Sequence, residues 1–98
     1  MRSIAGRSVR IMTFYYTYVL LSQFDNKYYV SSTSNLEKRI LTHNLGLVTS
    51  TKNRRPLKLI YYEACLDKLG SILREKQLKT GFGRAYLKRR LKTQLTID

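Results

Sequence analysis

The amino-acid sequence predicts a small α+β domain, in which a three-stranded antiparallel β-sheet is flanked by three helices in the order β-β-α-β-α-α. Two observations support this class. Short runs of β-forming residues alternate with segments of helical period, and polar or glycine-containing stretches separate them. A chain of 98 residues can build one modest hydrophobic core, which suits a single domain. We expect this domain to span residues 13–95, after a basic and disordered extension at residues 1–12.

The first two strands are expected to form a β-hairpin. Residues 15–21 are rich in Tyr, Val and Leu, which suit a buried strand. Residues 23–27 contain Asp and Asn, which favour a reversing turn. The second strand then covers residues 28–31.

The first helix begins after Ser34 or Asn35, either of which can cap it. Glu37 lies in its first turn, where a negative charge meets the positive end of the helix dipole. The helix is expected to run to about Asn44, because Gly46 follows as a stop signal.

Helical spacing places Leu36, Ile40 and His43 on one side of this helix, with Arg39 at the margin of that side. Arg39 and His43 are therefore neighbours at the edge of a buried face, from which both can reach into a cleft. The spacing alone is better explained by a core histidine and by an arginine that pairs with Glu37 or faces solvent.

Residues 45–57 show no period and are expected to form a long basic loop that contacts phosphates through Lys52, Arg54 and Arg55. An ordinary exposed loop is the alternative. A third strand follows at residues 58–63, which form an apolar run of β-forming residues.

The second helix is expected from Asp67, a plausible cap, to Lys79. Its predicted apolar stripe consists of Leu66, Leu69, Ile72 and Leu73. Glu75 lies on the flank of this stripe, so the period alone does not bury it.

Gly81 and Gly83 are expected to break that helix, and a third helix then covers residues 84–95. One face of it is basic and contacts phosphates or solvent, with Arg84, Lys88 and Arg89 as candidate contacts to nucleic acid.

The charge indicates a polyanionic partner, because 19 Lys and Arg face only 6 acids and the formal net charge is +13. A basic but merely solvated surface is the alternative. Cys65, the sole cysteine, excludes an intramolecular disulfide and is expected to be a small core residue. No apolar run is long enough to cross a bilayer, so no membrane partner is expected. These features fit a cytoplasmic location, with organelle targeting by residues 1–11 as the alternative.

The residues capable of chemistry are few, and they include one histidine, six acids and eight tyrosines. The sequence has no paired-carboxylate spacing, no zinc-protease or Cys-x-x-Cys motif, no phosphate-binding glycine loop and no nucleophile elbow. Without a family resemblance, the sequence predicts only a small α+β domain that binds nucleic acid.

The chain does resemble a known family, the GIY-YIG nucleases, and in particular their small single-domain bacterial members. The two tyrosine motifs correspond to residues 16–18 (Tyr-Thr-Tyr) and 29–31 (Tyr-Val-Ser). The similarity continues through residues 34–39, His43 and residues 50–56, 59–63, 74–79 and 81–84, and it covers residues 14–92. The order and spacing of these segments make the resemblance specific.

The resemblance implies a nuclease that uses one divalent metal, Mg²⁺ or Mn²⁺, held by a single glutamate, which is Glu75 here. Tyr18 matches the tyrosine proposed as general base or water-positioning group, and Tyr29 matches one that orders the attacking water or the phosphate. Arg39 matches a cation suited to the developing phosphate charge. His43 matches a second polar contact or proton carrier. Structural roles remain open: both tyrosines suit a sheet core, and Glu75 can pair with Lys79.

Three residue differences set this chain apart from the family pattern. Ser31 stands where the second motif has glycine, Tyr16 stands where the first has glycine, and residues 76–98 contain no asparagine. A serine at the second motif can crowd the cleft.

We therefore expect an endonuclease that hydrolyses DNA, with a catalytically weak or inactive nucleic-acid-binding module as the alternative. DNA is the expected partner, bound by shape or without sequence preference, and RNA is a further candidate. A monomer is favoured. A role associated with the bacterial nucleoid in DNA repair, recombination or processing would suit such a protein.

Overall fold

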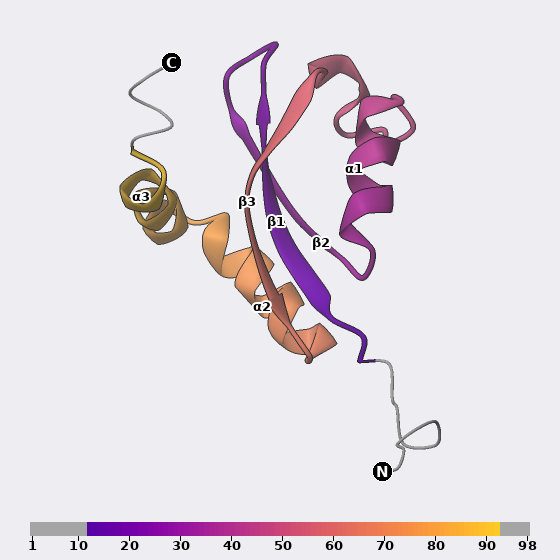
Figure 1. The fold of residues 1–98 in the computed structure, drawn as a ribbon. Helices are drawn as coiled ribbons and strands as arrows, with labels where there is room; N and C mark the ends of the chain where they lie inside the picture. The colour runs from indigo at the N-terminus through magenta and orange to yellow at the C-terminus, as the bar shows by residue number, and fades with distance from the viewer. Residues whose placement is uncertain (1–11, 93–98) are drawn as a thin grey trace.

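The computed structural model describes residues 12–92, and these residues form the predicted α+β domain. Residues 1–11 of the expected extension lie outside the described residues, and the third helix ends at Arg90, before the expected end at Leu95. Figure 1 shows a twisted sheet with α1 on one face and α2 and α3 on the other. The elements are β1 (Tyr15–Ser22), β2 (Tyr28–Thr33), α1 (Leu36–Asn44), a short 3-10 helix (Lys52–Arg54), β3 (Leu57–Cys65), α2 (Lys68–Leu78) and α3 (Gly81–Arg90).

The sheet has the strand order β2-β1-β3, with both pairings antiparallel, so β1 is central and β2 is an edge strand. Tyr18 pairs with Ser31 of β2, and Thr17 pairs with Ser32. Because successive residues of a strand point to opposite faces, the first pair belongs to the α1 face and the second to the α2 face.

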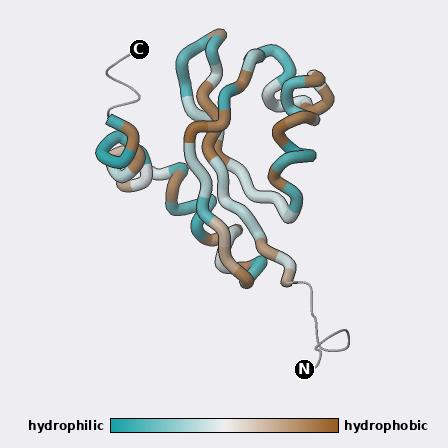
Figure 2. The backbone as a smooth tube through the Cα atoms, viewed as in Figure 1, coloured by the Kyte–Doolittle hydropathy of each residue, from teal (hydrophilic) through white to brown (hydrophobic). Residues whose placement is uncertain are grey.

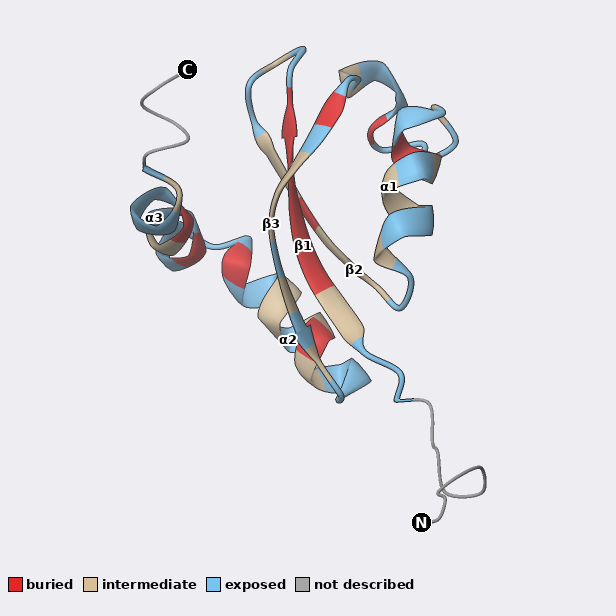
Figure 3. Ribbon diagram, in the orientation of Figure 1, coloured by how far each residue is buried: buried red, intermediate tan, exposed pale blue. Residues whose placement is uncertain are grey.

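A separate hydrophobic cluster covers each face of β1. Tyr18, Leu20 and Leu57 form the cluster under α1, where Leu36 and Ile40 pack against them. On the other face a second cluster packs under α2 and α3, and it comprises Val19, Val30, Leu78 and Leu87. Figure 3 shows the result: most of β1 is buried, whereas both outer strands are only partly so.

Local sequence signals set the ends of α1. Asn35 is its N-cap and accepts a hydrogen bond from the backbone N–H of Lys38 at 3.2 Å. After the helix, Gly46 adopts a φ of +80°, a conformation that costs glycine little. Both signals agree with the expected helix, and the predicted burial of His43 is confirmed.

The predicted apolar stripe of α2 is wrong. Leu66, Leu69 and Leu73 are all more than half exposed, and Ser71 and Leu78 are the buried residues of the helix. In this orientation Leu78 joins the cluster under α2 and α3, and Thr17 of β1 donates a hydrogen bond to the Ser71 carbonyl at 2.8 Å. Figure 2 shows hydrophobic residues along α2, and two of them, Leu69 and Leu73, are among the exposed residues of the described part of the chain.

The third helix begins earlier than expected, because Gly81 and Gly83 lie inside α3 and do not precede it. Thr80 caps the helix and accepts a hydrogen bond from the Gly83 N–H at 3.3 Å. A Cβ atom on Gly83 would lie 2.3 Å from the Leu78 backbone. Glycine is therefore required there for the close approach of α2 and α3.

Two smaller expectations also change. Cys65 is partly exposed and donates a hydrogen bond to the Asp67 carbonyl at 3.2 Å, so it is not a core residue. The loop after α1 is not featureless, because it contains the 3-10 helix. Among residues 12–92, no helix combines the length and apolar character that crossing a membrane requires.

Candidate active site

Tyr18 lies at the centre of a buried group of polar side chains between β1 and α1. Its side chain is fully buried, and its hydroxyl lies 2.8 Å from His43 Nε2. The Nε–H of Arg39 donates to the same hydroxyl at 3.3 Å. Burial raises the pKa of the Tyr18 phenol, and the hydrogen bond from Arg39 partly opposes that rise. Tyr18 therefore holds Arg39 and His43 together, but it does not face solvent.

His43 is also fully buried, and both of its ring nitrogens have partners. Nε2 meets Tyr18, and Nδ1 lies 2.7 Å from the Thr51 hydroxyl. Burial, together with the nearby charge of Arg39, lowers the pKa of His43 to about 4. The ring is therefore neutral at pH 7 and acts as a hydrogen-bonding group in the core.

Tyr29 is the more accessible of the two candidate tyrosines. It lies on edge strand β2, opposite Leu20 of β1, and is partly exposed. Its hydroxyl accepts a hydrogen bond from Ser50 at 3.2 Å, and its ring meets the His43 ring edge-on at a centroid distance of 5.3 Å. Tyr29 therefore shares the α1 face with Tyr18 while its hydroxyl lies near solvent.

Glu75 lies on the opposite face of the sheet from the tyrosines. It projects from α2, where one carboxylate oxygen accepts from the Ser32 hydroxyl at 2.8 Å and the other pairs with Lys79 at 2.8 Å. The Glu75 side chain is only 19% exposed, so it does not point into bulk solvent. The expected four-residue pairing with Lys79 is confirmed.

The two parts of the candidate site approach each other around β2. Ser31 lies beside Tyr18 on the α1 face, and the next residue, Ser32, binds Glu75 on the α2 face. A cavity of about 240 Å³ beside this strand is lined by Tyr28, Tyr29, Val30, Leu78, Lys79 and Arg84. The cavity extends from Tyr29 to Lys79, the lysine that pairs with Glu75. Arg84 is a second cation in its lining.

Ser31, which replaces the glycine of the second motif, lies in regular strand conformation in β2. Asn26 is the only non-glycine residue with positive φ in residues 12–92, so Ser31 needs no conformation reserved for glycine. The backbone of β2 therefore accommodates serine, and a hydrogen bond from the Ser31 side chain to Tyr18 is among the contacts that oppose the rise in the Tyr18 pKa.

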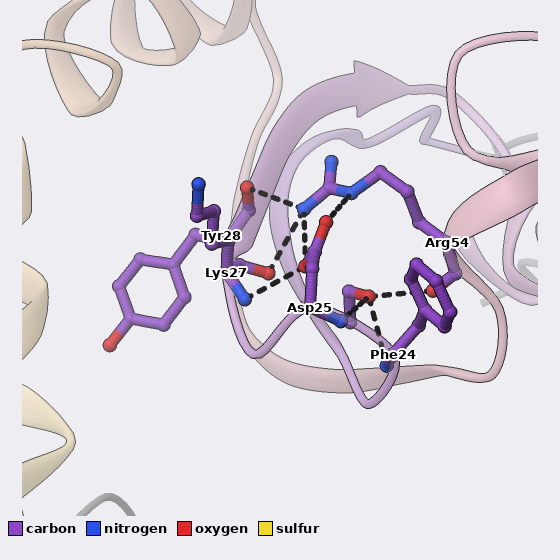
Figure 4. A network of polar contacts seen from close by, with 6 residues as sticks. Phe24, Asp25, Lys27, Tyr28 and Arg54 are labelled. Atoms are coloured by element: carbon purple, nitrogen blue, oxygen red, sulfur yellow. Dashed lines mark hydrogen bonds and ion pairs between the residues drawn. The ribbon is translucent and has the colours of Figure 1, made fainter.

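The predicted phosphate-binding cations divide into two groups. The Arg54 guanidinium is bonded to the hairpin turn. Its Nε donates to Asp25 at 2.7 Å, and its Nη2 donates to the carbonyls of Lys27 and Tyr28 (Figure 4). This pairing lowers the pKa of Asp25 to about 2. Arg55 is exposed but donates to the Lys52 carbonyl at 2.8 Å. Four predicted cations are exposed, and the described contacts include no hydrogen bond or ion pair from their side chains: Lys52, Arg84, Lys88 and Arg89.

Sequence reasoning missed Thr51 and Ser32, and it named Lys79 only as a partner of Glu75. Thr51 was grouped with the exposed loop, yet it is fully buried against His43. Ser32 binds Glu75, and Lys79 lines the cavity. The alternation of β2 carried a signal for Ser32, since it points away from Ser31, but nothing in the local sequence marks Thr51.

Glu75 is the candidate ligand for the divalent metal that the resemblance implies. In the described part of the chain, no group of three His, Cys, Asp or Glu side chains could hold a metal. A single, mostly buried carboxylate still fits Mg²⁺, which keeps several waters and takes phosphate oxygens from its substrate. The residues therefore fit a metal that the substrate helps to bind.

The three-stranded antiparallel sheet with its three helices is the fold of a small nuclease-type domain. A comparison with protein families supports this class, because the GIY-YIG catalytic domain matches residues 14–92. The chain therefore belongs to the GIY-YIG family. Nucleases of this family generally use a divalent metal and act on nucleic acid.

Similar proteins come from bacteria and are named UPF0213 proteins. One from Lactiplantibacillus plantarum is 43% identical over 68 residues, which cover 66% of this chain and 66% of the relative. Another from Staphylococcus haemolyticus is 40% identical over 70 residues, covering 70% of this chain and 84% of the relative. The solution NMR structure of a Bacillus halodurans UPF0213 protein is 28% identical, covers 85% of this chain and 82% of its own, and gives a TM-score of 0.43. These names state no substrate.

Proposed function

We propose that this protein is a divalent-metal-dependent endonuclease that hydrolyses phosphodiester bonds in DNA, with residues 13–95 as its catalytic domain. One observation carries the proposal. Ser31 and Ser32, adjacent on edge strand β2, bring the Tyr18–Arg39 pair and the Glu75 carboxylate to the two faces of the same short segment. A phosphate that meets the edge of β2 would have both groups beside it.

Arg39 is the proposed phosphate-binding cation. Its Nε is fixed by the Tyr18 hydroxyl, which leaves the terminal nitrogens of a partly exposed guanidinium for a phosphate. A forked cation held in this way suits the charge that develops on the scissile phosphate.

Tyr29 is the proposed group that orders the attacking water. Tyr18 is the proposed buried support, which holds Arg39 through its hydroxyl. This division follows from access, because the Tyr18 hydroxyl is buried whereas that of Tyr29 contacts the exposed Ser50. It revises the expectation that Tyr18 itself acts on the water. His43 acts through Tyr18, because it contacts the Tyr18 hydroxyl.

Glu75 is the proposed metal ligand, and Mg²⁺ or Mn²⁺ is the proposed ion. When bound, such a metal would polarise the phosphate and favour a nucleophilic water. The Lys79 ammonium neutralises the carboxylate in the absence of metal, and it would be free to bind phosphate in its presence.

Nucleic acid is expected to extend from β2 along α3. Lys79 and Arg84 line the cavity, and Lys88 and Arg89 continue the exposed positive charge on the same helix. Together with the net charge of +13, this predicts strongly salt-dependent binding. RNA is the second proposed substrate, and a monomer is the proposed functional unit.

A catalytically inactive nucleic-acid-binding module is the competing function. Two observations favour it: Ser31 stands where the family has glycine, and Lys79 already occupies one Glu75 oxygen. This module would keep the basic surface and lose only the cleavage.

A supercoiled-plasmid nicking assay with Mg²⁺ or Mn²⁺ separates the two functions. The parent protein is compared with Glu75→Gln and Arg39→Ala, and Glu37→Gln serves as a control because Glu37 is an exposed glutamate in the first turn of α1. We expect each site variant to lose roughly 100-fold in rate. Nicking that neither change affects would refute the site assignment, and salt-dependent binding without nicking would support the module.

A further inference from the structure

We propose that Thr51 is a positioning residue of the candidate site, which fixes the tautomer of His43 and, through Tyr18, the direction of Arg39. The inference rests on the proposed function for its consequence in cleavage, but its structural part is independent of it. Thr51 lies in the segment between α1 and the 3-10 helix, a region that the sequence assigns to solvent.

The contacts form an unbroken chain of side chains in the core. Thr51, His43 and Tyr18 are each 0% exposed. Thr51 Oγ1 lies 2.7 Å from His43 Nδ1, His43 Nε2 lies 2.8 Å from the Tyr18 hydroxyl, and Arg39 Nε lies 3.3 Å from that same hydroxyl. This series of contacts starts at Thr51 and ends at Arg39, whose side chain is partly exposed.

The contact with Arg39 favours one direction for the other hydrogen bonds of this series. A guanidinium only donates, so the Tyr18 oxygen must accept from Arg39. Because Arg39 already occupies one acceptor position of the Tyr18 oxygen, we infer that the hydroxyl hydrogen of Tyr18 is directed to His43 Nε2 and that this nitrogen carries no hydrogen. The neutral ring consequently carries its hydrogen on Nδ1 and donates it to Thr51.

Thr51 is the only described hydrogen-bond partner of Nδ1, which gives it control over the tautomer. Without its oxygen, Nδ1–H would be buried with no acceptor, and the hydrogen would favour Nε2. An Nε2–H group would point at the Tyr18 oxygen and compete with Arg39 for it. The guanidinium would lose the contact that orients it.

The tautomer can be measured directly, because His43 is the only histidine of the chain. We suggest ¹⁵N NMR of the histidine ring at pH 7 in the parent, Thr51→Val and Thr51→Ser. Thr49→Val is the matched control, since Thr49 is an exposed threonine two residues away. The expected result is the Nδ1–H tautomer in the parent, Thr51→Ser and the control, with a shift toward Nε2–H in Thr51→Val.

The parent measurement tests the proposal even where Thr51→Val does not fold. An Nε2–H tautomer in the parent would overturn it, and so would an unchanged tautomer in a folded Thr51→Val. This arm requires no cleavage, so it distinguishes failure of the Thr51 role from failure of the proposed nuclease function.

Plasmid nicking supplies the second arm. Thr51→Val is expected to lower kcat about tenfold with little change in KM, and Thr51→Ser is expected to recover most of the rate. A tautomer change that leaves kcat unaltered would overturn the link from Thr51 to Arg39.

Discussion

The two faces of the sheet hold their polar side chains in different ways. On the α1 face, Tyr18 and His43 are fully buried and bonded mainly to neutral partners. On the α2 face, Glu63 and Arg74 form an ion pair at 2.8 Å whose side chains are 31% and 24% exposed. Glu75 is likewise bonded to an exposed lysine. The α1 face therefore holds its polar side chains in fixed positions. The charged side chains of the α2 face can change their partners.

This difference suits the two proposed tasks. An arginine that meets a transition state benefits from a fixed direction, which a buried support supplies. A metal ligand must release its lysine when the ion arrives, which a half-exposed ion pair permits at low cost. The predictions below test this contrast, from the largest expected effect to the smallest.

Acid should destabilise the α1 face first. The pKa of His43 is lowered to about 4 in the folded protein, against about 6.5 in the unfolded chain. The unfolded chain therefore binds the proton more readily than the folded protein does. The stability contributed by the neutral His43 is present in full well above about pH 6.5, and it is lost as the pH falls toward 4. The total loss is roughly 3 kcal/mol, about half of it between pH 6.5 and 5.

Urea unfolding across this pH range measures the loss. The pKa values of the paired carboxyls Asp25 and Glu63 are themselves lowered, so their contributions disappear only at more acidic pH. His43→Gln should therefore abolish the slope between pH 6.5 and 5. A slope that persists in this variant would assign the effect to other groups.

Tyr18→Phe should also be costly. It leaves His43 Nε2 buried without a donor, for which about 1–3 kcal/mol of unfolding free energy is expected. Tyr16→Phe is the matched control, because Tyr16 is a partly exposed tyrosine of the same strand and face. Equal unfolding free energies for the two variants would show that the buried hydrogen bonds contribute nothing.

Much of this contrast was predictable from local patterns. The spacing of Leu36, Ile40 and His43 predicted the buried side of α1, and Asn35 was one of two expected caps. Such signals act within a few residues, so the sequence displays them directly.

The α2 face was not predictable in this way. Leucine spacing predicted the wrong side of α2, because contacts with the sheet decide which side faces it. Leu78 packs against Val19 and Val30. Thr17 donates to the Ser71 carbonyl, and Arg74 donates to Glu63. Thr51 was missed for the same reason, since its partner is set by the path of a loop and not by any neighbour in sequence.

On the α2 face, Glu63→Gln should cost less than Tyr18→Phe. The pair with Arg74 is partly exposed, so about 1 kcal/mol or less is expected in urea unfolding. Burial on its own would raise the pKa of Glu63, but hydrogen bonds from Arg74 and Tyr61, together with the charges of Arg74 and Arg90, lower it. A loss as large as that of Tyr18→Phe would contradict the distinction between the two faces.

Ser31→Gly should have the smallest effect and act on the rate. Removing the side chain opens the edge of β2, and we expect nicking to rise roughly threefold, equivalent to about 0.6 kcal/mol. Stability should fall slightly, because glycine weakens a strand. A lower rate in the plasmid assay would show that the serine contributes to the site.

The central claim is that Glu75 and the α1 face form one metal-dependent centre across β2. Mn²⁺ titration followed by ¹H–¹⁵N NMR tests it directly, because the paramagnetic ion broadens signals of nearby residues. We predict early broadening of the amide signals of Ser31, Ser32 and Lys79 in the parent protein, and its absence in Glu75→Gln. Unbroadened signals at these residues, or broadening that survives Glu75→Gln, would contradict the claim.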